Sequence, residues 1–263
     1  MPVADPQVDA RERVVFGNVR VDRVDLPGAV RRMRTFLASP QTHQVATVNL
    51  DFVALAGRRP DFRSALDQAD LAVADGMPLV WLSKLGGSPL PERVAGVELV
   101  DEACRLVAER RGGVFLLGAE APSAQAAARE IRRRHPGIRI VGVHSPPFRA
   151  LSAAEDAEIV GLIQSAAPDL LLVAFGAPRQ DLWIHAHRAE LAVPIAIGVG
   201  CVLDLLAGEL ARAPRWMRRT GLEWAFRLAQ EPRRLWRRYL LQDLPTLARL
   251  AITRRVDSRE TVA

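Results

Sequence analysis

Polar residues follow two short apolar runs in the first third of the chain. Thr47 and Asn49 close the run at residues 43–48, and Asp75 follows the run at residues 71–74. A carboxylate in such a position can act as a general base on a substrate hydroxyl. The structural alternative is that the aspartate shapes a turn before a helix and that the asparagine caps one. The spacing of these residues leaves both interpretations open.

Two further segments carry side chains suited to an anionic ligand. Arg93 follows a loop rich in glycine and proline at residues 86–91, and its planar guanidinium can clamp a phosphate. A solvated loop arginine is the structural alternative there. Arg179 and Gln180 follow a tight turn at Gly176, where both side chains can donate hydrogen bonds to a ligand. A turn and a helix start explain the glycine and the proline of that segment, but not the two adjacent donors.

Gly118 ends another apolar run, and a proline and a serine at residues 122–123 open a helix after it. Free backbone amides at such a helix start suit a nucleotide phosphate. The chain has neither the G-x-G-x-x-G spacing nor a P-loop, which counts against the common dinucleotide and nucleoside triphosphate sites. Cys104 and Cys201 are far apart and the five histidines are scattered, so we predict neither a disulfide framework nor a metal site.

The elements that must position these residues alternate along the chain up to about residue 200. Helical spacing of apolar residues occurs at 29–37, 97–108, 124–131 and 157–163. The apolar runs between them lie at residues 43–48, 71–74, 114–117, 138–143, 170–175 and 193–199. Continuous apolar runs that alternate with helices predict an α/β fold, in which helices cover both faces of a parallel sheet. Ligands bind beyond the carboxyl ends of such strands, where the candidate residues stand.

Positive charge is concentrated at the C-terminal end. The chain carries a net charge of +6, and between Arg212 and Arg255 twelve arginines stand against three acids. Helical segments are expected there from near Leu222 and from Pro232. We therefore predict a core at residues 1–211, a basic helical appendage at residues 212–255 and a tail at residues 256–263. The asymmetry indicates an anionic partner for the appendage, either nucleic acid, anionic lipid or a phosphorylated substrate.

Several motifs become specific when they are taken together. In chain order they are T-V-N-L-D, A-D-G-M-P, R-V-A-G, G-A-P-R-Q-D, G-V-G-C-V-L-D-L-L-A-G, R-A-P-R-W, G-L-E-W-A-F-R-L and E-P-R-R. This ordered set resembles the WecG/TagA/CpsF family of glycosyltransferases over residues 14–245. The resemblance implies a Rossmann-like parallel sheet covered by helices, with a C-terminal appendage. It also implies inverting transfer from a UDP-sugar to an undecaprenyl-diphosphate-linked saccharide, without a metal or another cofactor.

The resemblance also implies roles for particular residues. Asp75 matches the catalytic base, and Thr47 and Asn49 match the polar pair beside it. The substrate-binding residues that we predict, from the resemblance or from the turns described above, are Arg93, Gly118, Arg179, Gln180, Arg227, Arg234 and Arg237. Of these, the last three match appendage arginines that close over the pocket and contact phosphate. The family commonly has glycine where Cys201 stands, and this cysteine narrows the turn near the site.

The appendage interleaves arginine with Trp216, Trp224, Trp236 and Tyr239, a composition suited to a membrane interface. We expect a cytoplasmic protein bound peripherally to the inner face of the cell membrane, because the N-terminus is polar and the best apolar stretch is broken by proline, glycine and aspartate. Self-association of such a core is compatible with the sequence. The product is exopolysaccharide, capsule or a teichoic-acid-type polymer, and the sugar stays open.

Two other functions are alternatives to the glycosyltransferase. A nucleic-acid-binding protein would use the basic appendage, but no recognised nucleic-acid motif supports it. A nucleotide-cofactor oxidoreductase would use the same class of fold, but the glycine fingerprint is missing.

Overall fold

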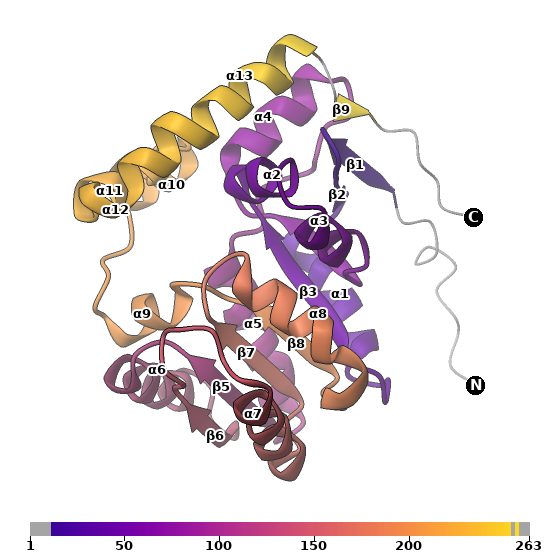
Figure 1. Ribbon diagram of the computed structural model, residues 1–263, viewed down its shortest axis with the longest axis vertical. Coiled ribbons are helices and arrows are strands. Elements are labelled where there is room, and N and C mark those ends of the chain that lie inside the picture. The colour runs from indigo at the N-terminus through magenta and orange to yellow at the C-terminus, as the bar shows by residue number, and fades with distance from the viewer. Residues whose placement is uncertain (1–11, 254–255, 258–263) are drawn as a thin grey trace.

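The computed structural model describes residues 12–253 and 256–257. A six-stranded sheet in the order β4-β3-β8-β7-β5-β6 forms the centre of the molecule (Figure 1). Each pair of neighbouring strands in it is parallel. Its strands are β3 (His43–Val48), β4 (Leu71–Ala74), β5 (Gly113–Gly118), β6 (Arg139–His144), β7 (Leu170–Ala174) and β8 (Ile195–Gly198). The predicted α/β class is confirmed, and the predicted runs match these strands to within a residue or two.

Helices cover both faces of the sheet, because successive residues of a strand point to opposite sides. In β5, Val114 and Leu116 belong to the apolar cluster that includes residues of α1 (Leu26–Phe36), α5 (Gly96–Glu109), α6 (Ala121–Arg134) and α9 (Val202–Ala207). Phe115 and Leu117 pack in a cluster on the other face with α7 (Ala153–Ala166) and α8 (Arg179–Leu191). The β3 and β4 end of that second face is covered by α2 (Leu50–Ala56), α3 (Pro60–Asp67) and α4 (Met77–Leu85). Strands buried on both faces read as continuous apolar runs, which explains why the sequence predicts them well.

A second, antiparallel sheet was not predicted from the sequence. It contains β1 (Arg13–Phe16), β2 (Val19–Asp22) and β9 (Val256–Asp257), with β1 in the middle. Residues of β9, assigned above to a tail, pair with β1 near the start of the chain. The Asp22 carboxylate of β2 joins this small sheet to the large one, because it accepts from the Ala72 backbone N–H of β4 at 2.7 Å. The same carboxylate pairs with Arg13 of β1 at 3.2 Å.

Helices follow one another through the predicted appendage. They are α10 (Arg215–Arg219), α11 (Glu223–Gln230), α12 (Pro232–Arg237), the π-helical segment η1 (Arg238–Asp243) and α13 (Leu244–Thr253). The helix starts expected near Leu222 and at Pro232 are confirmed. Figure 1 shows α13 lying beside α4, and Leu250 of α13 is buried in the same apolar cluster as Phe16. The appendage therefore packs against the core at its far end as well as at its start.

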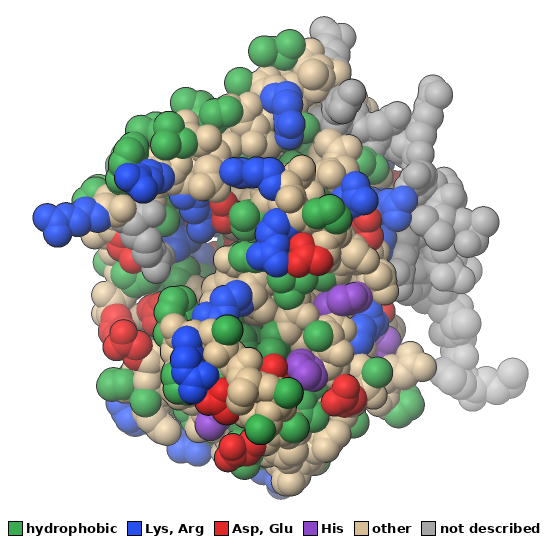
Figure 2. Space-filling view, viewed as in Figure 1, with side chains coloured by type: hydrophobic (Ala, Val, Ile, Leu, Met, Phe, Trp, Pro, Cys, Tyr) green, Lys and Arg blue, Asp and Glu red, His purple; other side chains and the backbone are tan. Residues whose placement is uncertain are grey.

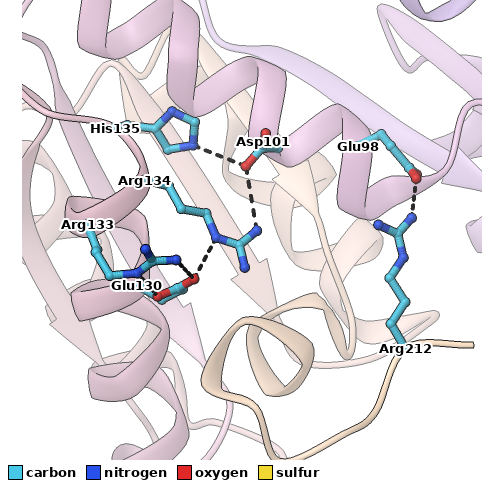
Figure 3. A network of polar contacts seen from close by, with 7 residues as sticks. All are labelled: Glu98, Asp101, Glu130, Arg133, Arg134, His135 and Arg212. Carbon is cyan, nitrogen blue, oxygen red and sulfur yellow. Dashed lines mark hydrogen bonds and ion pairs between the residues drawn. The ribbon is translucent and has the colours of Figure 1, made fainter.

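Ion pairs join the appendage to the core at both ends. Near its start, Arg212 donates to the Glu98 carboxylate on α5 (Figure 3). Arg218 donates to the same carboxylate. One turn further along α5, Asp101 faces His135 at the end of α6, at 3.2 Å between Oδ1 and Nε2. Helix α5 thus binds the appendage with one acid and α6 with another.

At the other end, the Arg238 guanidinium lies 3.2 Å from Asp51 on α2 and 3.9 Å from Asp243 in η1. Burial raises the pKa of Asp243 to about 7, and the nearby Asp51 charge adds to the rise, while Arg238 and Arg58 oppose it. Burial likewise raises the pKa of Asp51. This second contact between core and appendage therefore contains two buried acids whose ionisation is disfavoured.

The Asp243 carboxyl is expected to make stability depend on pH. Its pKa is 3.8 unperturbed and about 7 when folded, so the folded state binds a proton that the unfolded state releases in that window. The stability that this proton contributes is fully present below pH 3.8, and it is lost as the pH rises through about 7. Between pH 5 and 8, wild type should lose roughly 2 kcal/mol of unfolding free energy relative to Asp243→Asn. Urea unfolding at both pH values measures the difference. The exposed control Asp61→Asn keeps Asp243 and should lose stability between these pH values as wild type does. Parallel curves for wild type and Asp243→Asn would contradict the assignment.

Candidate functional site

The backbone fixes Asp75 at the carboxyl edge of the large sheet. Its N–H donates to the Val48 carbonyl at 2.7 Å, which extends the β3–β4 pairing by one residue. The Val94 N–H donates to the Ala74 carbonyl at 2.9 Å, so the loop before α5 lies against the end of β4. A Cβ on Gly96, the first residue of α5, would lie 3.2 Å from Asp75 Oδ2. The carboxylate therefore faces the N-terminus of α5, where backbone amides favour negative charge.

Opposing effects act on the Asp75 carboxyl. Burial has the largest effect and raises its pKa from 3.8 to about 6. The Arg93 charge, the Gly96 amide and the Arg227 charge lower it, whereas the Glu223 charge adds to the rise. At neutral pH the group is mostly ionised, yet it binds a proton more readily than an ordinary aspartate. That combination suits a general base.

Thr47 and Asn49 both lie next to this turn. The Thr47 hydroxyl donates to the Gly198 carbonyl at 3.4 Å, and the side chain is 8% exposed. Asn49 caps α2, since its Oδ1 accepts from the Phe52 N–H at 3.1 Å. The capping alternative for Asn49 is thus confirmed, in a position beside the turn that carries Asp75.

Two residues of α11 complete the surroundings of Asp75. Glu223 Oε2 accepts from Arg93 Nη1 at 2.5 Å, and Arg227 Nη2 donates to Cys201 Sγ at 2.8 Å. Two acids and two arginines thus meet where the core contacts the appendage. The sequence prediction contained Asp75, Arg93 and Arg227 of this cluster and missed Glu223, although that residue stands in the G-L-E-W motif. An acid in a segment dominated by arginine was the signal that could have identified it.

Gln180 supports the neighbouring turn after β8. It is 3% exposed, and its Oε1 accepts from the Gly200 N–H at 2.9 Å. A Cβ on Gly198 would lie 2.7 Å from Gln180 Nε2, so the glycine permits this close packing. Asp181 beside it is fully buried, and burial raises its pKa to about 7, while the neighbouring Gln180 amide lowers it. Gln180 reaches the same turn as Thr47, so it lies at the edge of the Asp75 site.

Gly118 and Arg179 lie further along the carboxyl edge. Strands β3, β8 and β7 separate β4 from β5, which places Gly118 roughly 19 Å from the end of β4. The chain leaves β5 towards β6 and leaves β7 towards β8, so Gly118 stands where the connections diverge, a common ligand position in open parallel sheets. Arg179 donates to the Arg149 carbonyl and lies over the Phe148 ring at 5.2 Å. These two predicted residues are therefore separate from the Asp75 cluster.

The remaining predicted arginines lie on α12. The Arg237 guanidinium lies over the Trp236 ring at 5.3 Å, and the residue is exposed. Arg234 also belongs to α12, and its side chain lies outside the described part of the structure. Across residues 12–253 and 256–257 no group of three or more His, Cys, Asp or Glu side chains is placed to hold a metal ion.

Comparison with known proteins covers nearly the whole chain. Residues 14–261 match the Glycosyl transferase WecG/TagA/CpsF family. The chain belongs to this family. This glycosyltransferase is 31% identical over 206 residues, 78% of each chain, to an N-acetylglucosaminyldiphosphoundecaprenol N-acetyl-beta-D-mannosaminyltransferase of Bacillus spizizenii. It is 30% identical over 229 residues to a Staphylococcus aureus protein of the same name, covering 86% of this chain and 87% of that one. The family resemblance and the enzyme class expected from the sequence are confirmed.

The joint between α10 and α11 holds the appendage of this glycosyltransferase against α4. Gly221 has a φ of +75°, and a Cβ there would lie 2.5 Å from Trp81 Cζ2 and 2.9 Å from Met77 Cβ. Met77 begins α4 directly after Asp75 and Gly76. The position of α11, and with it Glu223, therefore depends on close packing against the helix that follows Asp75.

Gly221→Ala should displace α11 from α4. Backbone strain of about 1–2 kcal/mol adds to the collision with Trp81. We expect trypsin to cleave the arginine-rich appendage several times faster than in wild type, measured by timed digestion and mass spectrometry. Gly87→Ala is the matched control, because Gly87 has a φ of +80° and nothing within 4 Å of an added Cβ. Equal cleavage rates in the two variants would show that the Trp81 contact does not hold the appendage.

Proposed function

We propose that this glycosyltransferase moves a sugar from a UDP-sugar to an undecaprenyl-diphosphate-linked saccharide, with inversion and without a metal, in the synthesis of a cell-surface polysaccharide. The observation that carries the proposal is the Asp75 carboxyl, which has a raised pKa and stands beside two arginines at the carboxyl edge of the sheet. The relatives' names, which specify a diphosphoundecaprenol acceptor and an N-acetylmannosaminyl group, support the same class of reaction. They make UDP-N-acetylmannosamine the first donor to test.

In the proposed reaction the acceptor hydroxyl gives its proton to an Asp75 carboxylate oxygen. The hydroxyl oxygen then forms a bond to the anomeric carbon while the bond from that carbon to the UDP oxygen breaks. A single displacement of this kind inverts the anomeric centre. Because Asp75 must be ionised to accept the proton, turnover should increase as the pH rises through about 6.

The departing UDP gains negative charge on its diphosphate, and fixed cations can stabilise that charge in place of a metal ion. Arg93 and Arg227 are the cations that act on Asp75. Their positions are fixed by Glu223 and Cys201 respectively. When UDP departs towards Arg93 and Arg227, the anomeric carbon lies between these arginines and the Asp75 carboxylate. This supports a metal-independent transfer.

A lipid-linked acceptor requires access from a membrane surface, and the appendage presents exposed apolar side chains. They include Trp216, which is 60% exposed, and Leu241, Leu244 and Ile252 along η1 and α13. Figure 2 shows hydrophobic side chains along the upper edge, where Figure 1 places α13, with basic side chains nearby. None of the helices in the described ranges is long and apolar enough to cross a bilayer. We propose that this surface binds peripherally to the cytoplasmic face of the cell membrane.

The arginine contacts favour this function over nucleic-acid binding. Arg212 and Arg218 pair with Glu98, and Arg238 pairs with Asp51. These three arginines are therefore used to dock the appendage on the core, which leaves less of its charge for a nucleic-acid backbone.

Asp75→Asn should abolish transfer without loss of the fold. An amide cannot accept the acceptor proton, so we expect kcat to fall by about 10²–10⁴-fold, with UDP-sugar affinity changed little. UDP release is measured with a panel of UDP-sugars and a short-chain lipid-diphosphate-linked N-acetylglucosamine. Asp61→Asn, an exposed acid on α3, serves as the control that keeps activity. Transfer by Asp75→Asn at a rate near that of wild type would exclude Asp75 as the base.

Charge introduced into the apolar surface should weaken membrane binding. The double variant Leu241→Glu, Leu244→Glu adds two exposed carboxylates and disturbs no buried packing. We expect at least a tenfold weaker affinity for phosphatidylglycerol vesicles in a sedimentation assay. Leu162→Glu, at an exposed leucine on α7, should bind the vesicles as wild type does. Unchanged binding of the double variant would place the membrane contact elsewhere on the molecule.

A further inference from the structure

Glu223 is an acid in a segment where arginines predominate, and it contacts the core rather than solvent. Its carboxylate accepts from Arg93 Nη1 at 2.5 Å, across 130 residues of sequence. Both side chains are mostly buried. The Arg93 guanidinium also has the largest charge effect on Asp75. One guanidinium therefore interacts with a carboxylate of the core and with a carboxylate of the appendage.

The location of Arg93 explains why a second partner matters. Arg93 belongs to the loop before α5, and an arginine side chain has about 2 kcal/mol of rotamer entropy to lose when it is fixed. Glu223 is the acid that pairs with it directly, and Glu223 is placed by the packing of Gly221 against Trp81. Whether Arg93 has this acidic partner thus depends on whether α11 is docked.

We propose that Glu223 is a positioning residue for transfer: it pairs with Arg93 and so limits the effect of that guanidinium on Asp75, and the charge arrangement around the base is complete only when α11 is docked on the core. This inference rests on the proposed function, in which Asp75 is the base. Glu223 acts through Arg93 and does not touch the reacting atoms. The appendage then does more than contribute arginines, because its Glu223 carboxylate also affects the basicity of Asp75.

The charges in the cluster give the direction of the effect. Asp75 and Glu223 balance Arg93 and Arg227 in the docked enzyme. Without the Glu223 charge, the arginines stabilise ionised Asp75 more strongly, because Glu223 raises the pKa of Asp75. The pKa of Asp75 should therefore fall, and Asp75 should become a weaker base. Arg93, released from its partner, should bind the donor diphosphate at least as well as before.

The experiment compares Glu223→Gln with wild type in UDP-release kinetics between pH 4.5 and 8. We expect the acid limb of the kcat/KM profile to move to lower pH by about half a unit. At neutral pH, kcat should fall severalfold while the KM for the UDP-sugar does not rise. Glu223→Asp keeps the charge and should restore much of the wild-type profile. Thermal unfolding of each variant establishes that the fold is retained.

Asp51→Asn is the matched control, because Asp51 is the core acid of another ion pair with the appendage, the pair with Arg238. Asp51 is not among the groups that shift the pKa of Asp75, so the acid limb of the kcat/KM profile of this variant should stay at the wild-type pH. An unmoved limb in Glu223→Gln, or a raised donor KM with unchanged kcat, would overturn the proposal and leave Glu223 as a docking contact alone.

A direct titration separates this inference from the proposed function. The Asp75 carboxyl carbon can be followed by NMR in ¹³C-labelled wild type and Glu223→Gln, with Asp75→Asn used for its assignment. A lower Asp75 pKa in Glu223→Gln supports the coupling even if no UDP-sugar is turned over, in which case the proposed reaction alone fails. An equal pKa in the two proteins overturns the coupling whatever the activity.

Discussion

The carboxylate of Asp75 is kept out of bulk water at the end of a buried strand, and the surrounding structure must offset the cost of its charge. The core supplies part of the compensation, through Arg93 and the backbone amide at the start of α5. The appendage supplies Arg227, together with a Glu223 carboxylate that acts in the opposite direction. Burial alone would keep the group protonated, and unopposed arginines would make it a poor base. The balance between these effects requires both parts of the chain in contact.

The same requirement accounts for the charge distribution along the sequence. An appendage rich in arginine repels itself unless acids lie nearby, and the core offers Glu98 to its first segment and Asp51 to its later one. Partly buried arginine pairs of this kind specify where the appendage docks, even where they add little net stability. Arg227, held by Cys201 between those two contacts, is directed towards the site. Docking and catalysis therefore use different arginines of one segment.

The sequence predicted the large sheet because a strand buried on both faces is a local apolar run, as residues 170–174 illustrate. It did not predict the small sheet. The pairing of Val15 with Asp257 joins distant segments and leaves no periodic pattern, whereas the β1–β2 hairpin, with its turn at Gly17 and Asn18, is local and was missed. The same limit applies to the site. Asp75 follows a strand and is recognisable locally, whereas the contact of Glu223 with Arg93 joins residues 130 positions apart. Gly118 was grouped with the other turns because chain order does not reveal that three strands lie between β4 and β5.

A raised pKa does not by itself identify the base, since four buried aspartates, Asp51, Asp75, Asp181 and Asp243, share this property. Asp181 has the greater shift, yet it is fully buried beneath Gly198 and Gln180, where an acceptor hydroxyl has no path to it. Asp243 lies between η1 and α2, and its raised pKa reflects burial and the charge of Asp51. Asp75 differs because it lies at the carboxyl edge of the sheet with two arginines acting on it. A displacement needs a proton acceptor for the attacking hydroxyl and positive charge for the leaving group, and among these aspartates Asp75 is the one beside Arg93 and Arg227 at the sheet edge.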